Sequence, residues 1–277
     1  MASRPSVDPA AVAADVSTAR KYAGVAPALV RRIAEAEAPK VKSHAEAVKR
    51  AKRKLHQAVG AYLDIEMPFD AWLAELQAAA ATPARRDEAL RGILHAHAST
   101  RERLADIEAF YAAVFAGLGE VGAVVDLACG LGPIARPFMP LPAGCRYGVF
   151  DAHQRLVDFD IQALALMGYP AFGAAVDLAS GPPDVAAPDV AADVVLVLKA
   201  LPCLAQLDPE APHRLLASIS APVVVVSYPI HSLGGGRRKM ADFYRQSFHT
   251  LAKRLPREWE ELDAPGELVF RGTAPGR

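Results

Sequence analysis

The chain has 277 residues, of which 52% are apolar and 22% charged, a balance typical of folded globular proteins that excludes an intrinsically disordered chain. Its apolar runs, such as 194–198 and 223–226, are far too short to span a membrane, and its early charges exclude a signal peptide, so we expect a cytoplasmic protein without membrane contact. The formal net charge of zero excludes a uniformly basic or acidic chain.

Charge is distributed unevenly along the sequence. Residues 1–60 contain twelve Lys and Arg against five Asp and Glu, whereas residues 121–236 contain five against ten. Such asymmetry is typical of a basic module that binds a polyanion and is attached to a near-neutral or acidic catalytic body.

Residues 11–63 have the pattern of a helical region. Ser17 and Thr18 can cap a helix, Pro27 begins a second helix, and Pro39 separates it from a third that runs to the end of this region. The apolar positions of the third helix recur at steps of three and four residues: Val41, Ala45, Val48, Leu55, Val59 and Tyr62. Its opposite side carries Lys42, Lys49, Arg50, Lys52, Arg53 and Lys54. This basic side is either a solvated bundle surface or a phosphate-contacting face, and the shortage of acids favours nucleic acid.

Two further helices are expected before residue 98. Asp70 can cap a short helix that ends at Ala79, and another helix follows at 85–97. His95 and His97 are two positions apart and point to different faces of this helix, so we expect no metal site. The cysteines have no Cys-x-x-Cys spacing, and we expect them to be reduced and mostly buried: Cys129, Cys145 and Cys203.

The next segment contains a capping pattern. Ser99 is placed as a helix N-cap with Glu102 as the third residue of a capping box, and the helix they open is expected to run to Gly117. Capping does not explain Arg101 and Arg103, since the dipole of a helix disfavours cations in its first turn unless an anion is present. We therefore expect Arg101 to hold a carboxylate or a phosphate.

Beyond residue 121 the pattern alternates strand and helix. The predicted strands are 123–127, 147–150, 171–176, 193–198 and 223–227, with helices at 154–167 and 209–219. Continuous apolar strands joined by helices predict an α/β fold whose parallel sheet is covered on both sides. A basic helix is expected at 237–254, and closing antiparallel strands at 259–262 and 267–270.

The first predicted strand runs into a glycine loop with the spacing Asp126-x-x-x-Gly130-x-Gly132. Glycine lets the backbone approach a ligand closely. The loop is not the dinucleotide fingerprint, because Pro133 follows the second glycine and Ala135 stands where a third glycine is required. It resembles the first motif of Rossmann-like S-adenosylmethionine-dependent methyltransferases.

Charged residues end the first four strands, where an open parallel sheet binds its ligands: Asp126, Asp151, Asp177 and Lys199. The Asp151 carboxylate can accept hydrogen bonds from both hydroxyls of a ribose, and Asp177 can accept one from an exocyclic adenine amine. The loop lacks the Lys-Ser/Thr of a P-loop. S-adenosylmethionine, which has no phosphates, therefore fits better than ATP or NAD.

Seven short motifs stand out along the chain: Ser17-Thr18-Ala19-Arg20-Lys21-Tyr22, Val48-Lys49-Arg50-Ala51-Lys52-Arg53, His97-Ala98-Ser99-Thr100-Arg101-Glu102-Arg103, Asp126-Leu127-Ala128-Cys129-Gly130-Leu131, Leu198-Lys199-Ala200-Leu201-Pro202, Ser227-Tyr228-Pro229 and Ser232-Leu233-Gly234. With them the chain resembles, over nearly its whole length, the aminoglycoside-resistance methyltransferases that act on 16S rRNA. The closer similarity is to the group that methylates N7 of a decoding-site guanine.

The resemblance implies a helical, basic rRNA-binding region at 1–119 and a Rossmann-like methyltransferase domain at 120–277. It implies a monomeric 16S rRNA (guanine(1405)-N(7))-methyltransferase that uses S-adenosylmethionine, acts on the 30S subunit and confers aminoglycoside resistance. It further implies that Lys199 and Ser227 stand near the target base as catalytic residues. The cofactor site would comprise His97, Ser99, Thr100, Arg101, Asp126, Ala128, Gly130, Asp151, Ala152, Asp177, Leu178, Leu198 and Lys199. The RNA-binding residues would be Arg20, Lys21, Lys49, Arg50, Lys52, Arg53, Lys54, Arg237, Arg238 and Lys239.

The chain departs from the family pattern at two places. Gly132 replaces the usual Asn of the glycine loop, and Gly236 stands where the first arginine after Ser232-Leu233-Gly234 is expected. Which of the following basic residues contacts RNA is left open by this shift: Arg237, Arg238 or Lys239.

The chemistry of the predicted site suits an N7 target. Guanine N7 has a lone pair in the neutral base, so its methylation needs no general base, and Lys199 could stabilise O6 or a phosphate. Cys203 follows proline as in cytosine-C5 methyltransferases, but Leu201 and Leu204 around it favour packing over nucleophilic attack. The Asn/Asp-Pro-Pro-Tyr/Phe loop of amino-group methylases is missing after the fourth strand.

Three alternatives stay open at this point. They are a methyltransferase acting on adenine N1 of the same rRNA region, a small-molecule methyltransferase of an antibiotic pathway, and a non-catalytic RNA-binding protein. A dehydrogenase fits least, because the dinucleotide fingerprint is missing.

Overall fold

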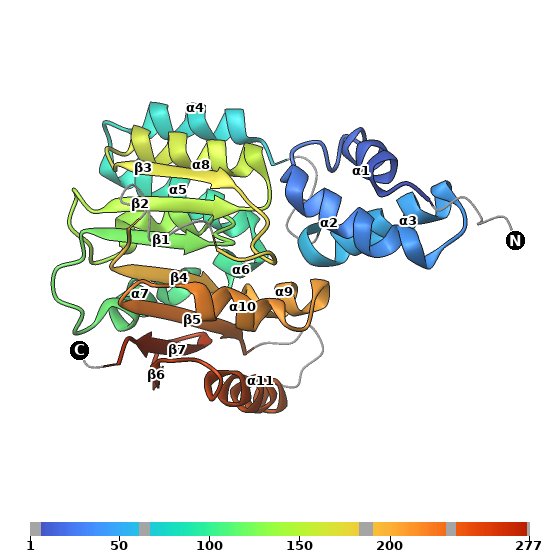
Figure 1. The fold of residues 1–277 in the computed structure, drawn as a ribbon. Helices are drawn as coiled ribbons and strands as arrows, with labels where there is room; N and C mark the ends of the chain where they lie inside the picture. The colour runs from blue at the N-terminus through green and yellow to red at the C-terminus, as the bar shows by residue number, and fades with distance from the viewer. Residues whose placement is uncertain (1–6, 61–66, 183–190, 231–236, 276–277) are drawn as a thin grey trace, which may run out of the picture.

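A computed structural model of the protein describes residues 7–60, 67–182, 191–230 and 237–275. It contains a seven-stranded sheet flanked by helices and, beside the sheet, a small helical unit built from the N-terminal residues (Figure 1). Within the described residues, none of the helices is both long and apolar enough to cross a membrane.

The sheet has the strand order β3-β2-β1-β4-β5-β7-β6. The first five strands are parallel, and the last two are antiparallel and close one edge, which confirms the predicted Rossmann-like sheet. Their bounds are β1 Ala123–Leu127, β2 Arg146–Asp151, β3 Ala171–Ala175, β4 Val194–Leu198, β5 Val223–Pro229, β6 Glu258–Leu262 and β7 Glu267–Thr273. The strand order reverses between β1 and β4, which places a ligand crevice at the carboxyl ends of these strands.

Helices cover both faces of the sheet because each central strand is apolar on both sides. Val124 of β1 belongs to one core cluster and Val125 to the other. The first cluster joins the sheet to α4 Phe69–Ala79, α5 Pro83–Ala96, α7 Ile107–Phe115 and α8 Gln154–Leu166. The second joins it to α9 Leu201–Leu207, α10 Ala211–Ser218 and α11 Arg237–Ala252.

The N-terminal helices form a separate unit, called here the α1–α3 module. It comprises α1 Pro9–Ser17, α2 Pro27–Glu37, α3 His44–Leu55 and a π-helical turn, η2 His56–Gly60. Their buried apolar residues form a third core that includes Val16, Leu29, Ile33 and Leu55. Of the residues predicted as one helical region, 1–119, α4 to α7 therefore pack on the sheet and not on this module.

Several details of the module differ from expectation. Asp8 caps α1 by accepting a hydrogen bond from Ala10 N, whereas Ser17 and Thr18 stand at the C-terminal end of that helix. Pro27 begins α2 as predicted. Leu55 is buried as predicted, and Val41, Val48 and Val59 pack against the same core. Ala45 is exposed, and contacts with α1 and α2 bury Ala47 and Ala51 instead. Tyr62 lies outside the described residues.

The expected long helix from Ser99 to Gly117 is wrong. The segment divides into α6 Ala98–Arg101, a 3-10 turn η3 Leu104–Asp106, and α7. The capping box is also wrong, because the Glu102 carboxylate pairs with Lys199 and His97 occupies the N-cap position of α6. Tertiary charge contacts override the local capping preference here.

Two smaller corrections concern helix starts. Asp70 stands in the first turn of α4 without capping it, and Pro68 is the N-cap residue. The helix α9 was not predicted, although Pro202 near its start is a common helix-opening signal.

Candidate functional site

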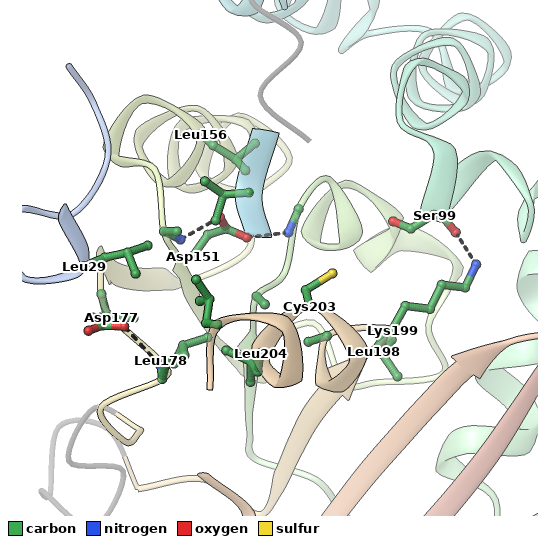
Figure 2. A pocket seen from close by; sticks show the side chains of 18 of the residues that line it. Leu29, Ser99, Asp151, Leu156, Asp177, Leu178, Leu198, Lys199, Cys203 and Leu204 are labelled. Carbon is green, nitrogen blue, oxygen red and sulfur yellow. Dashed lines mark hydrogen bonds between the residues drawn. The ribbon is translucent and has the colours of Figure 1, made fainter. Parts of the chain in front are cut away.

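A pocket lies at the carboxyl ends of β1, β2 and β4 (Figure 2). Ten of the thirteen residues predicted to bind the cofactor line it: His97, Ser99, Ala128, Gly130, Asp151, Ala152, Asp177, Leu178, Leu198 and Lys199. Further lining comes from residues that were not predicted to bind the cofactor, including Leu29, Val59 and Leu156. The pocket is elongated, with Asp177 and Leu29 at one end and Ser99 and Lys199 at the other (Figure 2).

The glycine loop forms the floor of the pocket. Gly130 has a φ of 54°, and a Cβ there would lie 3.1 Å from the His97 ring. Ala128 also has a positive φ, 55°, which is unusual for a residue other than glycine. Backbone strain of this kind costs free energy and is concentrated at ligand sites.

Asp151 ends β2 and is fixed by the loop. Its Oδ2 accepts a hydrogen bond from Gly130 N at 3.0 Å and its Oδ1 accepts one from Ala152 N. Burial raises the pKa of this carboxyl, and the backbone donors partly oppose that shift. An oriented carboxylate with remaining lone pairs can accept hydroxyl donors, as the ribose hypothesis requires.

Asp177 lies at the far end of the pocket and is paired with a residue of the α1–α3 module. Its Oδ2 accepts a hydrogen bond from Arg32 Nε at 2.6 Å and its Oδ1 accepts one from Arg32 Nη2 at 3.0 Å. The Asp177 side chain is 3% exposed. No local sequence pattern predicts this pair, because its members are 145 positions apart.

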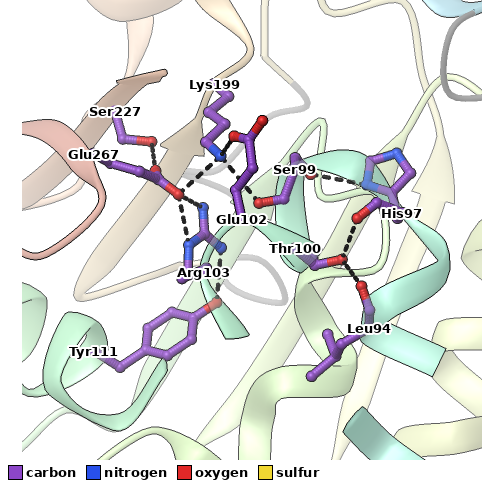
Figure 3. A network of polar contacts seen from close by, with 10 residues as sticks. All are labelled: Leu94, His97, Ser99, Thr100, Glu102, Arg103, Tyr111, Lys199, Ser227 and Glu267. Carbon is purple, nitrogen blue, oxygen red and sulfur yellow. Dashed lines mark hydrogen bonds and ion pairs between the residues drawn. The ribbon is translucent and has the colours of Figure 1, made fainter. Parts of the chain in front are cut away.

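Lys199 stands at the opposite end within a network of charges (Figure 3). Its Nζ lies 2.7 Å from Glu102 Oε2, 3.0 Å from Ser99 O and 3.1 Å from Glu267 Oε1. Ser99 O and Glu102 Oε2 accept hydrogen bonds from the ammonium group, and Glu267 forms an ion pair with it. The Lys199 backbone has a φ of 58°, a strained conformation held by the surrounding structure.

Glu267 of β7 is the centre of this network. It also accepts a hydrogen bond from Arg103 Nε at 2.8 Å and one from Ser227 Oγ at 2.6 Å. Arg103 donates in turn to Tyr111 Oη at 3.2 Å, and burial raises the pKa of that phenol to about 12. Glu267 and Arg103 were not predicted as site residues, and a charged residue opening an otherwise apolar strand was the available signal for Glu267.

Of the two predicted catalytic residues, which both contact Glu267, one lines the pocket. This residue is Lys199. Ser227 is fully buried and donates its hydroxyl hydrogen to Glu267, and the pocket lining formed by the described residues does not include it. Ser227 can therefore act on the pocket through Glu267.

His97 is buried beside the glycine loop. Burial and the nearby charges of Lys199, Arg101 and Arg103 lower its pKa to about 4, so the imidazole is neutral near pH 7. Its Nδ1 lies 2.8 Å from Ser99 Oγ.

Three predicted cofactor residues lie outside the pocket lining formed by the described residues: Thr100, Arg101 and Asp126. Thr100 is buried and donates to the carbonyls of Leu94 and His97, which fixes the turn into α6. Arg101 is exposed, with Nη1 3.4 Å from His95 O.

Asp126 lies beneath the glycine loop. It accepts a hydrogen bond from Tyr147 Oη at 3.1 Å, and burial raises its pKa to about 7. A Cβ on Gly132 would come within 2.9 Å of its Oδ2, so glycine at that position leaves room for the carboxyl. Asp126 thus supports the loop from below.

The predicted RNA-binding residues divide into two sets. Arg20, Lys49 and Arg53 are exposed on the α1–α3 module. Three others are less accessible or bonded to neighbouring groups: Lys21 lies 3.2 Å from His56 Nδ1, Arg50 pairs with Glu37, and Lys54 donates to Gln206 O. Lys52 is half-buried. The side chains of Arg237, Arg238 and Lys239, and all of Ser232, Leu233, Gly234 and Gly236, lie outside the described residues.

The remaining reactive groups add no second centre within the described part of the chain. Cys203 lines the pocket, while Cys129 and Cys145 are buried. No group of three or more His, Cys, Asp or Glu among the described residues is arranged to hold a metal ion.

Comparison with known proteins gives a consistent set of relatives. The sequence model of the family described as ribosomal RNA methyltransferase (FmrO) matches residues 17–269. The chain is 38% identical over 259 residues to a 16S rRNA (guanine(1405)-N(7))-methyltransferase of Frankia casuarinae, which covers 92% of this chain and 90% of that protein. It is 35% identical over 261 residues to one of Micromonospora echinospora, which covers 92% and 93%.

Solved structures agree with the sequence relatives. The crystal structure of 16S rRNA methyltransferase RmtF in complex with S-adenosyl-L-homocysteine is similar with a TM-score of 0.80 and 30% identity, and the similarity covers 99% of each chain. The 16S rRNA methylase RmtB is similar with a TM-score of 0.74 and 27% identity, over 97% of this chain and 99% of that one.

Proposed function

The chain belongs to the ribosomal RNA methyltransferase (FmrO) family and is an S-adenosylmethionine-dependent rRNA methyltransferase; from this premise we propose that it acts as a 16S rRNA (guanine(1405)-N(7))-methyltransferase and confers aminoglycoside resistance. The observation that carries the proposal is the pocket at the carboxyl ends of β1, β2 and β4, where a strained glycine loop, the Asp151 carboxylate and Lys199 meet. The fit of its polar groups to the cofactor supports this assignment.

The pocket's groups suit the parts of S-adenosylmethionine. Asp151 can accept hydrogen bonds from the ribose hydroxyls, while Leu178 and the neighbouring apolar residues can enclose the adenine. Gly130 lies on the floor, where a side chain would collide with His97. The amino acid part then extends toward His97 and Ser99, with Arg101 beyond the lining as a candidate partner for its carboxylate.

The bound cofactor supplies a methyl group that its sulfonium has already activated. The lone pair of guanine N7 would form a bond to the methyl carbon as the bond from that carbon to sulfur breaks. The methylated base would then carry the positive charge, and no proton would be removed. This suits a pocket in which Lys199 is held as a cation and His97 is neutral. The protein's task is to align the base and exclude water.

We propose that Lys199 contacts the target base. Of its two carboxylate partners, Glu102 has a side chain that is 36% exposed, whereas the Glu267 side chain is 1% exposed. An incoming guanine O6 can therefore replace Glu102 while Glu267 continues to hold the ammonium. A charge-assisted hydrogen bond to O6 would orient N7 toward the methyl group.

The α1–α3 module supplies the basic surface for docking on the 30S subunit. We assign docking to this module instead of the whole of residues 1–119, because α4 to α7 share the core of the sheet. Arg20, Lys49 and Arg53 are its exposed candidates for phosphate contacts, to which the N-terminal end of α11 adds Arg237, Arg238 and Lys239. A ribosomal substrate implies a cytoplasmic enzyme, which we propose to act as a monomer.

The test is transfer of labelled methyl groups from S-adenosylmethionine to isolated 30S subunits, followed by borohydride and aniline cleavage to map N7-methylguanine. We expect one cleavage at the decoding-site guanine. Label at another position, or no label, contradicts the proposal. A stop of reverse transcription without aniline cleavage would identify adenine N1 as the target instead.

A further inference from the structure

We propose that the α1–α3 module is part of the cofactor site, and that Asp177 anchors this module through Arg32 instead of accepting a hydrogen bond from the adenine amino group. The inference deepens the proposed function and rests on it. It makes Arg32 and Asp177 positioning residues, and it makes Leu29 a direct contact of the cofactor.

The carboxylate of Asp177 is fully occupied in the structure. Its Oδ2 accepts hydrogen bonds from Arg32 Nε at 2.6 Å and from Ser180 Oγ at 2.7 Å. Its Oδ1 accepts them from Arg32 Nη2 at 3.0 Å and from Ala179 N at 3.2 Å. A carboxylate offers about four lone-pair sites, so four donors leave none for an adenine amino group.

The module also contributes directly to the wall of the pocket. Leu29 is 2% exposed and lines the pocket beside Asp151 and Asp177 (Figure 2). Val59 of η2 lines it as well. Leu29 and Arg32 are three residues apart in α2 and therefore lie on the same face of that helix. One face of α2 thus provides both Leu29, an apolar contact at the adenine end of the pocket, and Arg32, the cation that binds Asp177.

Further hydrogen bonds join the module to the rest of the chain. Ala26 N donates to Ala152 O at 2.8 Å, and Gln154 N donates to Gly24 O at 2.8 Å. Lys54 Nζ donates to Gln206 O at 2.6 Å. Arg32 and Asp177 form the ion pair nearest to the adenine end. Breaking it lets α2 move away from the pocket, and Leu29 moves with α2.

A dependence of this kind works in both directions. If docking of the module favours cofactor binding, cofactor binding must favour docking of the module by the same factor, because the coupling free energy is shared. The same module carries the exposed basic residues proposed to contact rRNA. The cofactor would therefore prepare the rRNA-binding surface.

The experiment measures binding of S-adenosylhomocysteine to the full-length protein by calorimetry. The variants are Arg32→Gln, Asp177→Asn and the double variant. We expect each single variant to raise the dissociation constant of S-adenosylhomocysteine about tenfold. The double variant should lose no more affinity than the more affected single variant, since both changes break the same ion pair. Arg32→Lys should recover part of the affinity.

Arg31→Gln is the matched control, because Arg31 is exposed, lies in the same helix and loses the same charge. We expect it to bind S-adenosylhomocysteine as the wild type does. Thermal unfolding of each variant shows whether the fold is retained.

A second ligand separates anchoring from direct recognition. S-inosylhomocysteine carries an oxygen in place of the adenine amino group. We expect Asp177→Asn to leave the ratio of the two affinities unchanged. If Asp177→Asn abolishes the preference for the amino group while Arg32→Gln binds S-adenosylhomocysteine normally, Asp177 contacts adenine directly and the inference is wrong. A wild type that binds S-adenosylhomocysteine but methylates no 30S subunit refutes the proposed function alone, while a wild type that binds none refutes both.

Discussion

The two ends of the cofactor pocket are held in different ways. At the Lys199 end every member of the network comes from the sheet and the helices that pack on it, called here the sheet body. The side chains of Lys199, Arg103 and Glu267 are all at most 6% exposed, while Glu102 beside them is 36% exposed (Figure 3). At the adenine end the wall is shared between the sheet body and the α1–α3 module, and the Arg32 side chain that joins them is 26% exposed. One end is a closed part of the core, whereas the other is a joint between two units.

The difference matches what each end must do. A methyl transfer requires reacting atoms to be aligned closely, and buried, mutually satisfied charges fix a side chain better than exposed ones do. Docking on a large RNA requires a surface that can adapt, and interfaces between units within a chain are where relative motion is expected. We therefore expect changes at the Lys199 end to affect folding and rate, and changes at the adenine end to affect cofactor affinity.

The largest effect is expected from breaking the closed end. Glu267→Ala leaves Arg103 and Lys199 buried without their shared carboxylate, which should lower the free energy of unfolding by about 3 to 5 kcal/mol. Denaturant unfolding measures it. The matched control is Glu260→Ala, which removes the partner of Arg271 from the adjacent strand, where the Glu260 side chain is 56% exposed. We expect the control to change stability by less than about 1 kcal/mol. Equal effects of the two substitutions would contradict the distinction between the ends.

The second prediction concerns the rate. Lys199→Gln keeps a hydrogen-bond donor but removes the cation proposed to contact guanine O6, so we expect kcat for methylation of 30S subunits to fall about 100-fold. The dissociation constant of S-adenosylhomocysteine should change by less than about threefold, because the contact is made with the base. A comparable loss of cofactor affinity would instead place Lys199 in the cofactor site.

The sequence was informative where structure depends on neighbouring residues. The apolar runs of β1, β4 and β5 predict the parallel sheet, and Asp151 and Lys199 are identified because residues following such strands meet at one edge. It was uninformative where the partners are distant. Arg32 and Asp177 are 145 positions apart, and no local pattern connects them.

The same limit explains the errors. Ser99 and Glu102 have the spacing of a capping box, yet Glu102 instead pairs with Lys199, 97 positions away. A surface capping interaction and an ion pair with a nearly buried lysine compete for one carboxylate, and the second wins because an unpaired buried cation is costly. Ser227 was predicted as the last residue of its strand, but β5 continues to Pro229, and the Ser227 hydroxyl donates to Glu267 of β7.

A third prediction tests the floor that connects the two ends. Burial raises the pKa of Asp126 from its ordinary value of 3.8 to about 7, so between these values the folded protein retains a proton that the unfolded chain has lost. This carboxyl therefore lowers the free energy of unfolding increasingly as the pH rises from about 4 to about 7, and the full destabilisation is present above that range. Asp126→Asn removes this pH-dependent destabilisation. Its stability relative to the wild type should increase by about 2 to 3 kcal/mol between pH 5 and pH 8. Unfolding in denaturant at both pH values measures it, and a difference that does not depend on pH would contradict it.

The smallest effect is expected from loosening the joint. A Cβ on Gly24 would lie 2.5 Å from the His153 ring, so Gly24→Ala should push the α1–α3 module away from the start of α8. We expect a loss of about 1 to 2 kcal/mol in stability from the overpacking. Leu29 would move with the module, so S-adenosylhomocysteine should bind several-fold more weakly, while the Lys199 network stays intact. Gly92→Ala in α5 is the matched control, since nothing lies within 4 Å of the added methyl group. Because alanine favours a helix interior more than glycine does, the control should gain up to about 1 kcal/mol. The contradicting result is a Gly24→Ala protein that is destabilised but binds S-adenosylhomocysteine as tightly as the wild type. The affinity of the adenine end would then not depend on the module.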